Sequence, residues 1–213
     1  FPPLLQELRG YPDSIVGYLI SARGLGNFLS FFTVVQLTRF NPRLCLFIGL
    51  AVQSIAGLWM SSLDMNMTSA DVFWSNILHG WGFGTAYTPM AVLTFSTLSM
   101  HLLTQGNAIF SLLRLLGSSI FIALTLVVFV RTATEAGVNL SSLVDAFDLR
   151  NLSAWITILG EPDEVPLRSR LMTEIRQQAS MIGYINAFHL LTLASALAAP
   201  LAFLFVVRKS VKP

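Results

Sequence analysis

The sequence predicts an all-α protein, a polytopic bundle of transmembrane helices with five spans. Hydrophobic residues make up 54% of the 213-residue chain and charged residues 11%, whereas soluble domains carry about 25% charge. The mean hydropathy is +0.68. The 28 residues from 72 to 99 contain no Asp, Glu, Lys or Arg, and about 20 apolar residues are enough to cross the hydrocarbon layer. These observations favour a bilayer over water as the surroundings.

Charge and cysteine content exclude several function classes. The formal charge is only +2 and the basic residues are scattered, so no nucleic-acid partner is predicted. Cys45 is the only cysteine, which excludes an intrachain disulfide or a cysteine metal cluster. The three histidines lack metal-ligand spacing, and no pair of spans presents a nucleophile with its base. We therefore predict no metal, no cofactor and no enzymatic activity.

The chain divides by composition into spans and links. Residues 1–13 bear prolines and charges and predict an external loop or the end of a preceding helix, since the chain is expected to be part of a longer protein. Apolar residues recur at helical spacing within 132–178, which predicts an external amphipathic segment on the membrane or over the bundle. The predicted spans are 14–36, 44–61, 72–99, 107–131 and 179–207, followed by a tail at 208–213.

Basic residues in the short links predict the orientation. Arg39, Pro42 and Arg43 lie in the first link and three further basic residues in the tail, whereas the second link carries only acids. Positive loops face the cytoplasm. The N-terminus is therefore expected outside and the C-terminus in the cytoplasm of an integral membrane protein, with a bacterial inner (plasma) membrane as the expected location.

Small residues are concentrated in three spans. Gly80 and Gly84 are four residues apart, the spacing that lets a neighbouring helix approach closely, and Pro89 predicts a kink or hinge. Two interpretations remain open, namely ordinary packing and a helix that must bend or slide, as transporters require. The complete set of predicted packing or hinge residues is Gly24, Gly26, Gly80, Gly82, Gly84, Pro89 and Gly117.

Two arginines lie within predicted spans. Arg23 is about nine residues into the first span and Arg114 about eight into the fourth. A charge near mid-bilayer costs about 2.5–3.5 kcal/mol on insertion scales. Each side chain either snorkels to the near surface in a structural role or lies in a translocation path. His79 and His189 also lie within spans, where a proton relay and interhelical hydrogen bonding are the alternatives.

Polar and aromatic groups near the midplane are candidates for contact with a small hydrophobic substrate. For each of them, lipid-facing or helix-packing duty is the alternative. With the two arginines, the predicted translocation path comprises Arg23, Asn27, Gln53, Trp81, Tyr87, Thr88, Arg114 and Asn186.

Three stretches resemble the EmrB/QacA-type drug:proton antiporters, a fourteen-helix branch of the major facilitator superfamily. They are YPDSIVGYLISARGLGNFLS, QGNAIFSLLRLLGSSIFIAL and IRQQASMIGYINAFHLL, in the family's order and spacing. Arg23 and Arg114 fall on the family's arginines. The chain departs from the family's cytoplasmic-loop pattern at Val34 and Thr38.

The resemblance implies that the chain is similar to the last five spans, the C-terminal half, of a multidrug efflux protein. It implies export of hydrophobic compounds in exchange for protons by alternating access, with an N-terminal helix bundle as partner. No Asp or Glu lies inside the predicted spans, so the proton-bearing acids are expected in that missing bundle. The alternative is a non-transporting membrane scaffold that binds a partner through 132–178.

Overall fold

The computed structural model describes residues 1–96, 98–147 and 164–204. Within these ranges every regular element is a helix, so the all-α prediction is confirmed. The long helices are α1 (Asp13–Phe40), α2 (Pro42–Ser61), α3 (Ser69–Phe95), α4 (Leu103–Phe147) and α6 (Glu164–Leu201). Short turns of helix lie at Leu4–Leu8, Met100–Leu102 and Ala202–Leu204.

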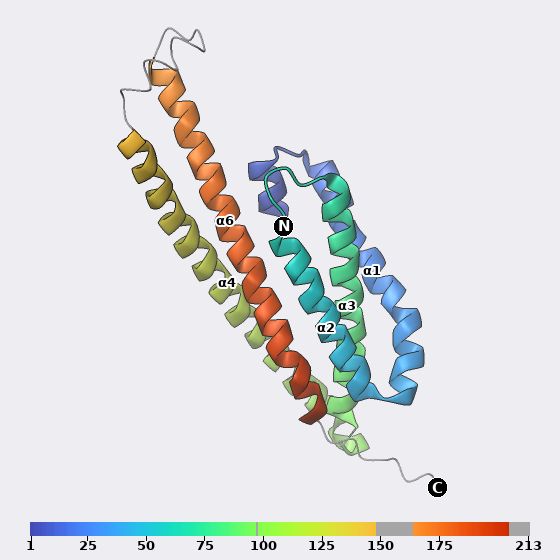
Figure 1. Ribbon diagram of the computed structural model, residues 1–213. Coiled ribbons are helices and arrows are strands. Elements are labelled where there is room, and N and C mark those ends of the chain that lie inside the picture. Colours follow the sequence, from blue (N-terminus) through green and yellow to red (C-terminus); the bar gives the residue numbers. More distant parts are fainter. Residues whose placement is uncertain (97, 148–163, 205–213) are drawn as a thin grey trace.

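The helices form a layer whose order in space differs from their order in the chain. α3 packs on both α1 and α2, α2 packs on α6, and α6 packs on α4. The resulting order is α1, α3, α2, α6, α4 (Figure 1). Among the described residues, α1 and α4 are therefore the edges of the layer, and α3 is enclosed on two sides.

Four segments are long and apolar enough to cross a membrane: Asp13–Phe40, Pro42–Ser61, Met100–Ser142 and Ser169–Leu204. They correspond to four of the five predicted spans. The predicted span at 72–99 is not among them. Ser75, Asn76, His79 and Thr85 are all buried against protein, so the case for α3 as the fifth span rests on its 27 residues and its enclosed position.

α3 begins and ends earlier than its apolar run. Thr68 and Asp71 form a capping box, in which the Asp71 backbone amide donates to the Thr68 hydroxyl at 3.2 Å and the Thr68 backbone amide donates to the Asp71 carboxylate at 3.0 Å. This arrangement satisfies free amides in the first turn. The helix therefore starts at Ser69, three residues before the predicted boundary, and ends at Phe95.

The link between the first two spans is a single residue. α1 continues to Phe40 and α2 begins at Pro42, which has no amide hydrogen to leave unpaired at a first helical position. The Asn41 side chain accepts a hydrogen bond from the Arg43 amide at 3.1 Å. The predicted loop of Arg39, Pro42 and Arg43 is thus the junction of two helices.

The described parts of the predicted amphipathic segment 132–178 are helical and continuous with two spans. α4 continues through 132–147 without a break, and α6 begins at Glu164 and runs on through 179. At 1.5 Å per residue the 45 residues of α4 measure about 67 Å, roughly twice the hydrocarbon thickness. The pair extends beyond the ends of α1, α2 and α3 (Figure 1). The remainder of this segment, 148–163, and the predicted tail at 208–213 lie outside the described residues.

Residues 1–13, predicted as an external loop or the end of a preceding helix, contain a short turn of helix at Leu4–Leu8. Leu4 and Leu5 lie in a turn of π-helix and are fully buried against the starts of α1 and α3 and the middle of α6. The Arg9 guanidinium donates to the Met65 carbonyl at 2.6 Å, and Gly10 adopts a positive φ of 63° where the chain turns into α1. This segment therefore closes one end of the helix layer.

Candidate functional site

Glycines bring α1 and α3 into contact backbone to backbone. A Cβ atom on Gly26 would collide with the Ile77 carbonyl, and one on Gly80 would collide with the Arg23 carbonyl. One turn further on, a Cβ on Gly84 would meet the side chains of Ser30 and Asn27. The predicted small-residue face of Gly80 and Gly84 thus lies against α1, and the two helices run parallel.

The opposite face of α3 approaches α2 through two more glycines. A Cβ on Gly82 would lie 2.8 Å from the backbone nitrogen of Gln53, and one on Gly49 would collide with the backbone at Ala86. Pro89 is buried in the same helix, and its predicted hinge role stays a prediction. α3 is therefore closely packed on both faces, between α1 and α2.

Arg23 lies at the centre of the α1–α3 contact. It is ten residues from the start of α1, or about 15 Å along the axis, and it is partly buried. One guanidinium nitrogen, Nη2, donates to the side-chain oxygen Oδ1 of Asn76 at 3.1 Å. The side-chain nitrogen Nδ2 of Asn76 in turn donates to the Val72 backbone carbonyl at 2.8 Å. Arg23 therefore points at α3, where a fixed amide holds it.

His79 lies one helical turn after Asn76 on α3 and is 8% exposed. Its Nδ1 atom has no hydrogen-bond partner among the described residues, and neither does the buried Nε atom of Arg23. The structure therefore brings two basic side chains with unused polar atoms to the middle of the same helix pair.

Arg114 and Tyr87, predicted separately, lie together. The Arg114 guanidinium carbon is 6.0 Å from the centre of the Tyr87 ring, within the range of a cation–π interaction. The Phe83 ring stacks on the Tyr87 ring, with ring centres 5.9 Å apart. This contact joins α3 to α4 on an exposed side of the layer.

The remaining path candidates are dispersed. Trp81 donates from Nε1 to the Thr33 hydroxyl at 3.1 Å, which makes it part of the α1–α3 contact. Asn27 is exposed on α1, Gln53 is half-buried on α2 and Asn186 is half-buried on α6. Their roles stay predictions.

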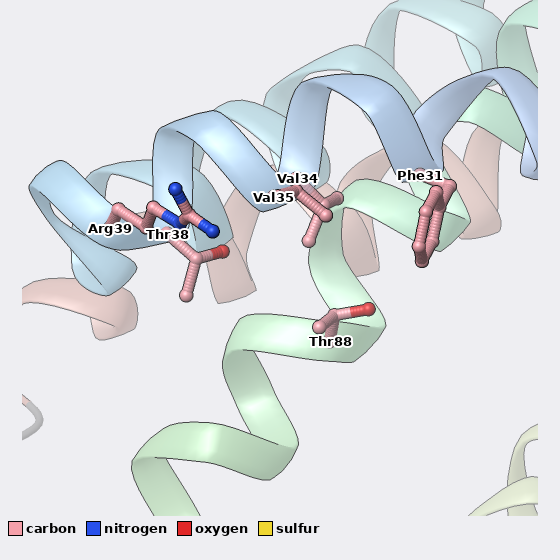
Figure 2. Close-up of a pocket in the computed structure, with 6 residues that line it drawn as sticks. All are labelled: Phe31, Val34, Val35, Thr38, Arg39 and Thr88. Atoms are coloured by element: carbon pink, nitrogen blue, oxygen red, sulfur yellow. The ribbon is translucent and has the colours of Figure 1, made fainter.

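A pocket of about 300 Å³ opens between the end of α1 and α3 (Figure 2). It is lined mainly by apolar side chains, and Thr88 and Arg39 are the only two predicted residues on its wall. Because Phe31 is already eight residues beyond Arg23, the pocket is separate from the buried arginine. Its lining consists of Phe31, Val34, Val35, Thr38, Arg39 and Thr88.

Gly24 and Gly117 face open space, since a Cβ atom on either would meet nothing within 4 Å. Within the described structure, no residue in the most hydrophobic part of Met100–Ser142, which includes most of α4, is buried. The packing role predicted for these glycines therefore stays a prediction, and it concerns surfaces that the described residues leave uncovered. Among the described residues no cluster of His, Cys, Asp and Glu is suited to hold a metal ion.

Asn76 is the site residue that sequence reasoning missed. It is four residues before Gly80, so it shares the helix face that approaches α1. The sequence did contain a sign of this role, because Asn76 is a polar residue on the same helix face as Gly80 in a span without charged residues.

One curated protein shows sequence similarity to the chain. The chain is 25% identical over 125 residues, 58% of its length, to the colistin resistance protein EmrB of Acinetobacter baumannii. The matched stretch spans 24% of that protein, so the chain covers about a quarter of its relative's length. No protein-family model and no solved structure gives a significant match. The predicted resemblance is confirmed at this level: the chain is an integral membrane helix layer similar to part of an EmrB protein.

Proposed function

We propose that this chain is the C-terminal part of a proton-coupled membrane transporter that exports hydrophobic drugs or related small molecules by alternating access. One observation carries the proposal: Arg23 sits in mid-span within a glycine-lined contact between two parallel helices and is held by Asn76. The similarity to a protein named for colistin resistance supports it.

The energetic argument concerns the buried charge. An arginine in the middle of a span is unfavourable by about 2.5–3.5 kcal/mol on insertion scales, and a simple packing helix gains nothing from it. Glycine faces give the neighbouring helices a smooth surface on which small shifts are sterically possible. A charge at a closely packed, adjustable contact is typical of an ion or substrate pathway.

The proposal places the proton-bearing acids outside this chain. Within the described residues, the acids of α1 and α3 are Asp13 and Asp71, and both lie in a first helical turn. A second helix bundle, in the missing part of the protein, would supply the buried carboxylates. The proposed location is a bacterial inner membrane, with the N-terminal end outside and the C-terminus in the cytoplasm.

Efflux in whole cells tests this function. The full-length protein, produced in a strain that lacks its own drug exporters, is expected to lower ethidium accumulation. Arg23→Ala and Arg114→Ala are expected to reduce efflux while the protein stays in the membrane, and Arg176→Ala, an exposed arginine on α6, serves as the matched control. Full efflux in both site variants would refute the roles of the two arginines.

The length of α4 and α6 favours a second candidate. Because these helices extend well beyond one bilayer, the chain could act as a scaffold whose projecting hairpin binds a partner protein. Specific capture of one partner by the 132–178 segment, together with absence of efflux, would support this alternative. Efflux by the full-length protein would exclude a purely structural role.

A further inference from the structure

We infer that Arg23, Asn76 and His79 form a binding site for a carboxylate group in the middle of the α1–α3 pair. The inference deepens the proposed function and rests on it for the origin of the carboxylate. The geometry itself stands on the described contacts, so it can be tested without a transport assay.

The first observation is the incomplete pairing of Arg23. A guanidinium carries five N–H donors and stays protonated in proteins. Here Nη2 is bonded to the Asn76 side-chain oxygen at 3.1 Å, whereas the buried Nε has no partner in the part of the chain that the structure describes. A neutral amide oxygen satisfies one donor, and none of the described residues provides a counterion for the positive charge.

The second observation comes from the facing helix. His79 is more than nine-tenths buried, and its Nδ1 has no partner among the described residues. It lies three residues after Asn76, which places both side chains on the same side of α3. Two independent side chains thus offer unused polar atoms to one small region.

The chemistry that fits both is a carboxylate. A buried cation is stabilised chiefly by an opposite charge with hydrogen bonds in good geometry, and a planar carboxylate matches the guanidinium fork. The two acids at the starts of these helices are already engaged: Asp13 accepts a hydrogen bond from Gln6, and Asp71 is bonded to Thr68. The described residues therefore supply no acid at this depth.

Two sources can provide this group. One is an Asp or Glu side chain from another part of the full-length protein, and the other is the carboxylate of a transported compound. Both would bind Arg23 in the same way, and an experiment with a small aromatic acid separates them.

Binding is measured on the full-length protein in nanodiscs by the shift in its thermal midpoint. The probe is 2-naphthoate, and its uncharged analogue 2-naphthamide is the chemical control. If the carboxylate comes from a solute, naphthoate raises the midpoint of the wild type and naphthamide does not. Arg23→Gln is expected to weaken naphthoate binding at least tenfold, His79→Leu to weaken it less, and Arg176→Gln to leave it unchanged.

If the protein supplies the carboxylate, wild type does not respond to naphthoate. Replacing the responsible acid by its amide, tested for each acid in the other spans, then creates naphthoate binding, and adding Arg23→Gln abolishes it. Arg23→Lys, which keeps the charge but loses the fork, gives intermediate binding and covers the case in which Arg23→Gln does not fold.

The inference is overturned if no variant binds naphthoate through Arg23, or if naphthoate and naphthamide bind equally, since water then satisfies both side chains. Its failure is distinct from that of the transporter proposal. If the protein binds naphthoate through Arg23 but moves no ethidium, the site stands and the transport function is refuted. If it moves ethidium but does not bind naphthoate through Arg23, the transport function stands and the site is refuted.

Discussion

The carbonyl oxygen of Arg23 occupies the position that a side chain on Gly80 would need. α1 and α3 therefore meet at the level of their main chains, next to the buried guanidinium. A helix pair this close depends on the absence of a Cβ atom at a few positions, and the following predictions use that dependence.

Gly80→Ala is expected to lower stability by about 1–3 kcal/mol, because backbone atoms of α1 must move to admit the methyl group. Gly24→Ala on α1 is the matched control, since nothing lies within 4 Å of its added Cβ, and it should be neutral or stabilising by up to about 1 kcal/mol through helix propensity. Unfolding in mixed detergent micelles measures both. Equal stability of the two variants would contradict the close α1–α3 contact.

A glycine also lies at a close contact between α4 and α6, so a larger residue there is expected to lower stability. A Cβ on Gly183 would lie 2.9 Å from both the ring and the carbonyl oxygen of Phe129, whereas one on Gly137 would lie an ordinary 3.7 Å from Ala179. Gly183→Val should therefore destabilise the pair by about 1–3 kcal/mol, and Gly137→Ala should not. A cysteine crosslink between α4 and α6 reports whether the pair separates.

Asp71 makes the start of α3 sensitive to acid. Hydrogen bonds from Thr68 hold the pKa of the Asp71 carboxyl below its usual value, so folding favours the ionised form. The resulting stabilisation is complete above the unfolded pKa of about 3.9 and is lost as pH falls through the lower folded value. The thermal midpoint of wild type should fall in that window relative to that of Asp71→Asn. A constant difference between the two proteins from pH 7 to pH 2 would rule out this role.

The contact between Arg114 and Tyr87 predicts that efflux requires an aromatic ring at position 87. Tyr87→Phe keeps an aromatic face under the guanidinium and should leave efflux near wild type, whereas Tyr87→Leu removes an interaction of about 0.5–2 kcal/mol. Initial ethidium efflux rates should then fall several-fold in Tyr87→Leu alone. Equal rates in both variants would show that the aromatic ring is not used.

The sequence was sufficient to predict the helical class, and it singled out Arg23 and the glycines of 72–99, whose functional roles stay predictions. Charged residues are rare in long apolar runs, so each one stands out. Pairing was harder to predict: α1 and α3 are separated in the chain by α2, and local patterns carry no information about which helices become neighbours. The close approach of Arg114 to Tyr87 is a consequence of that pairing.

Helix ends were also poorly predicted, for a physical reason. Hydropathy marks where a chain leaves the bilayer, and the predicted span at 107–131 follows that boundary. Helix formation is set by backbone hydrogen bonding and propensity, so α4 continues to Phe147 past the end of its apolar run. The buried Leu4 and Leu5 were missed because nearby prolines and charges suggested a loop.

Proton-driven transport by the purified full-length protein tests the central claim most directly. In proteoliposomes with an imposed pH gradient, we expect ethidium transport that a protonophore abolishes, that Arg23→Gln reduces at least tenfold and that Arg176→Gln leaves intact. Transport at the wild-type rate in Arg23→Gln, or no gradient-dependent transport by any form of the protein, would contradict it.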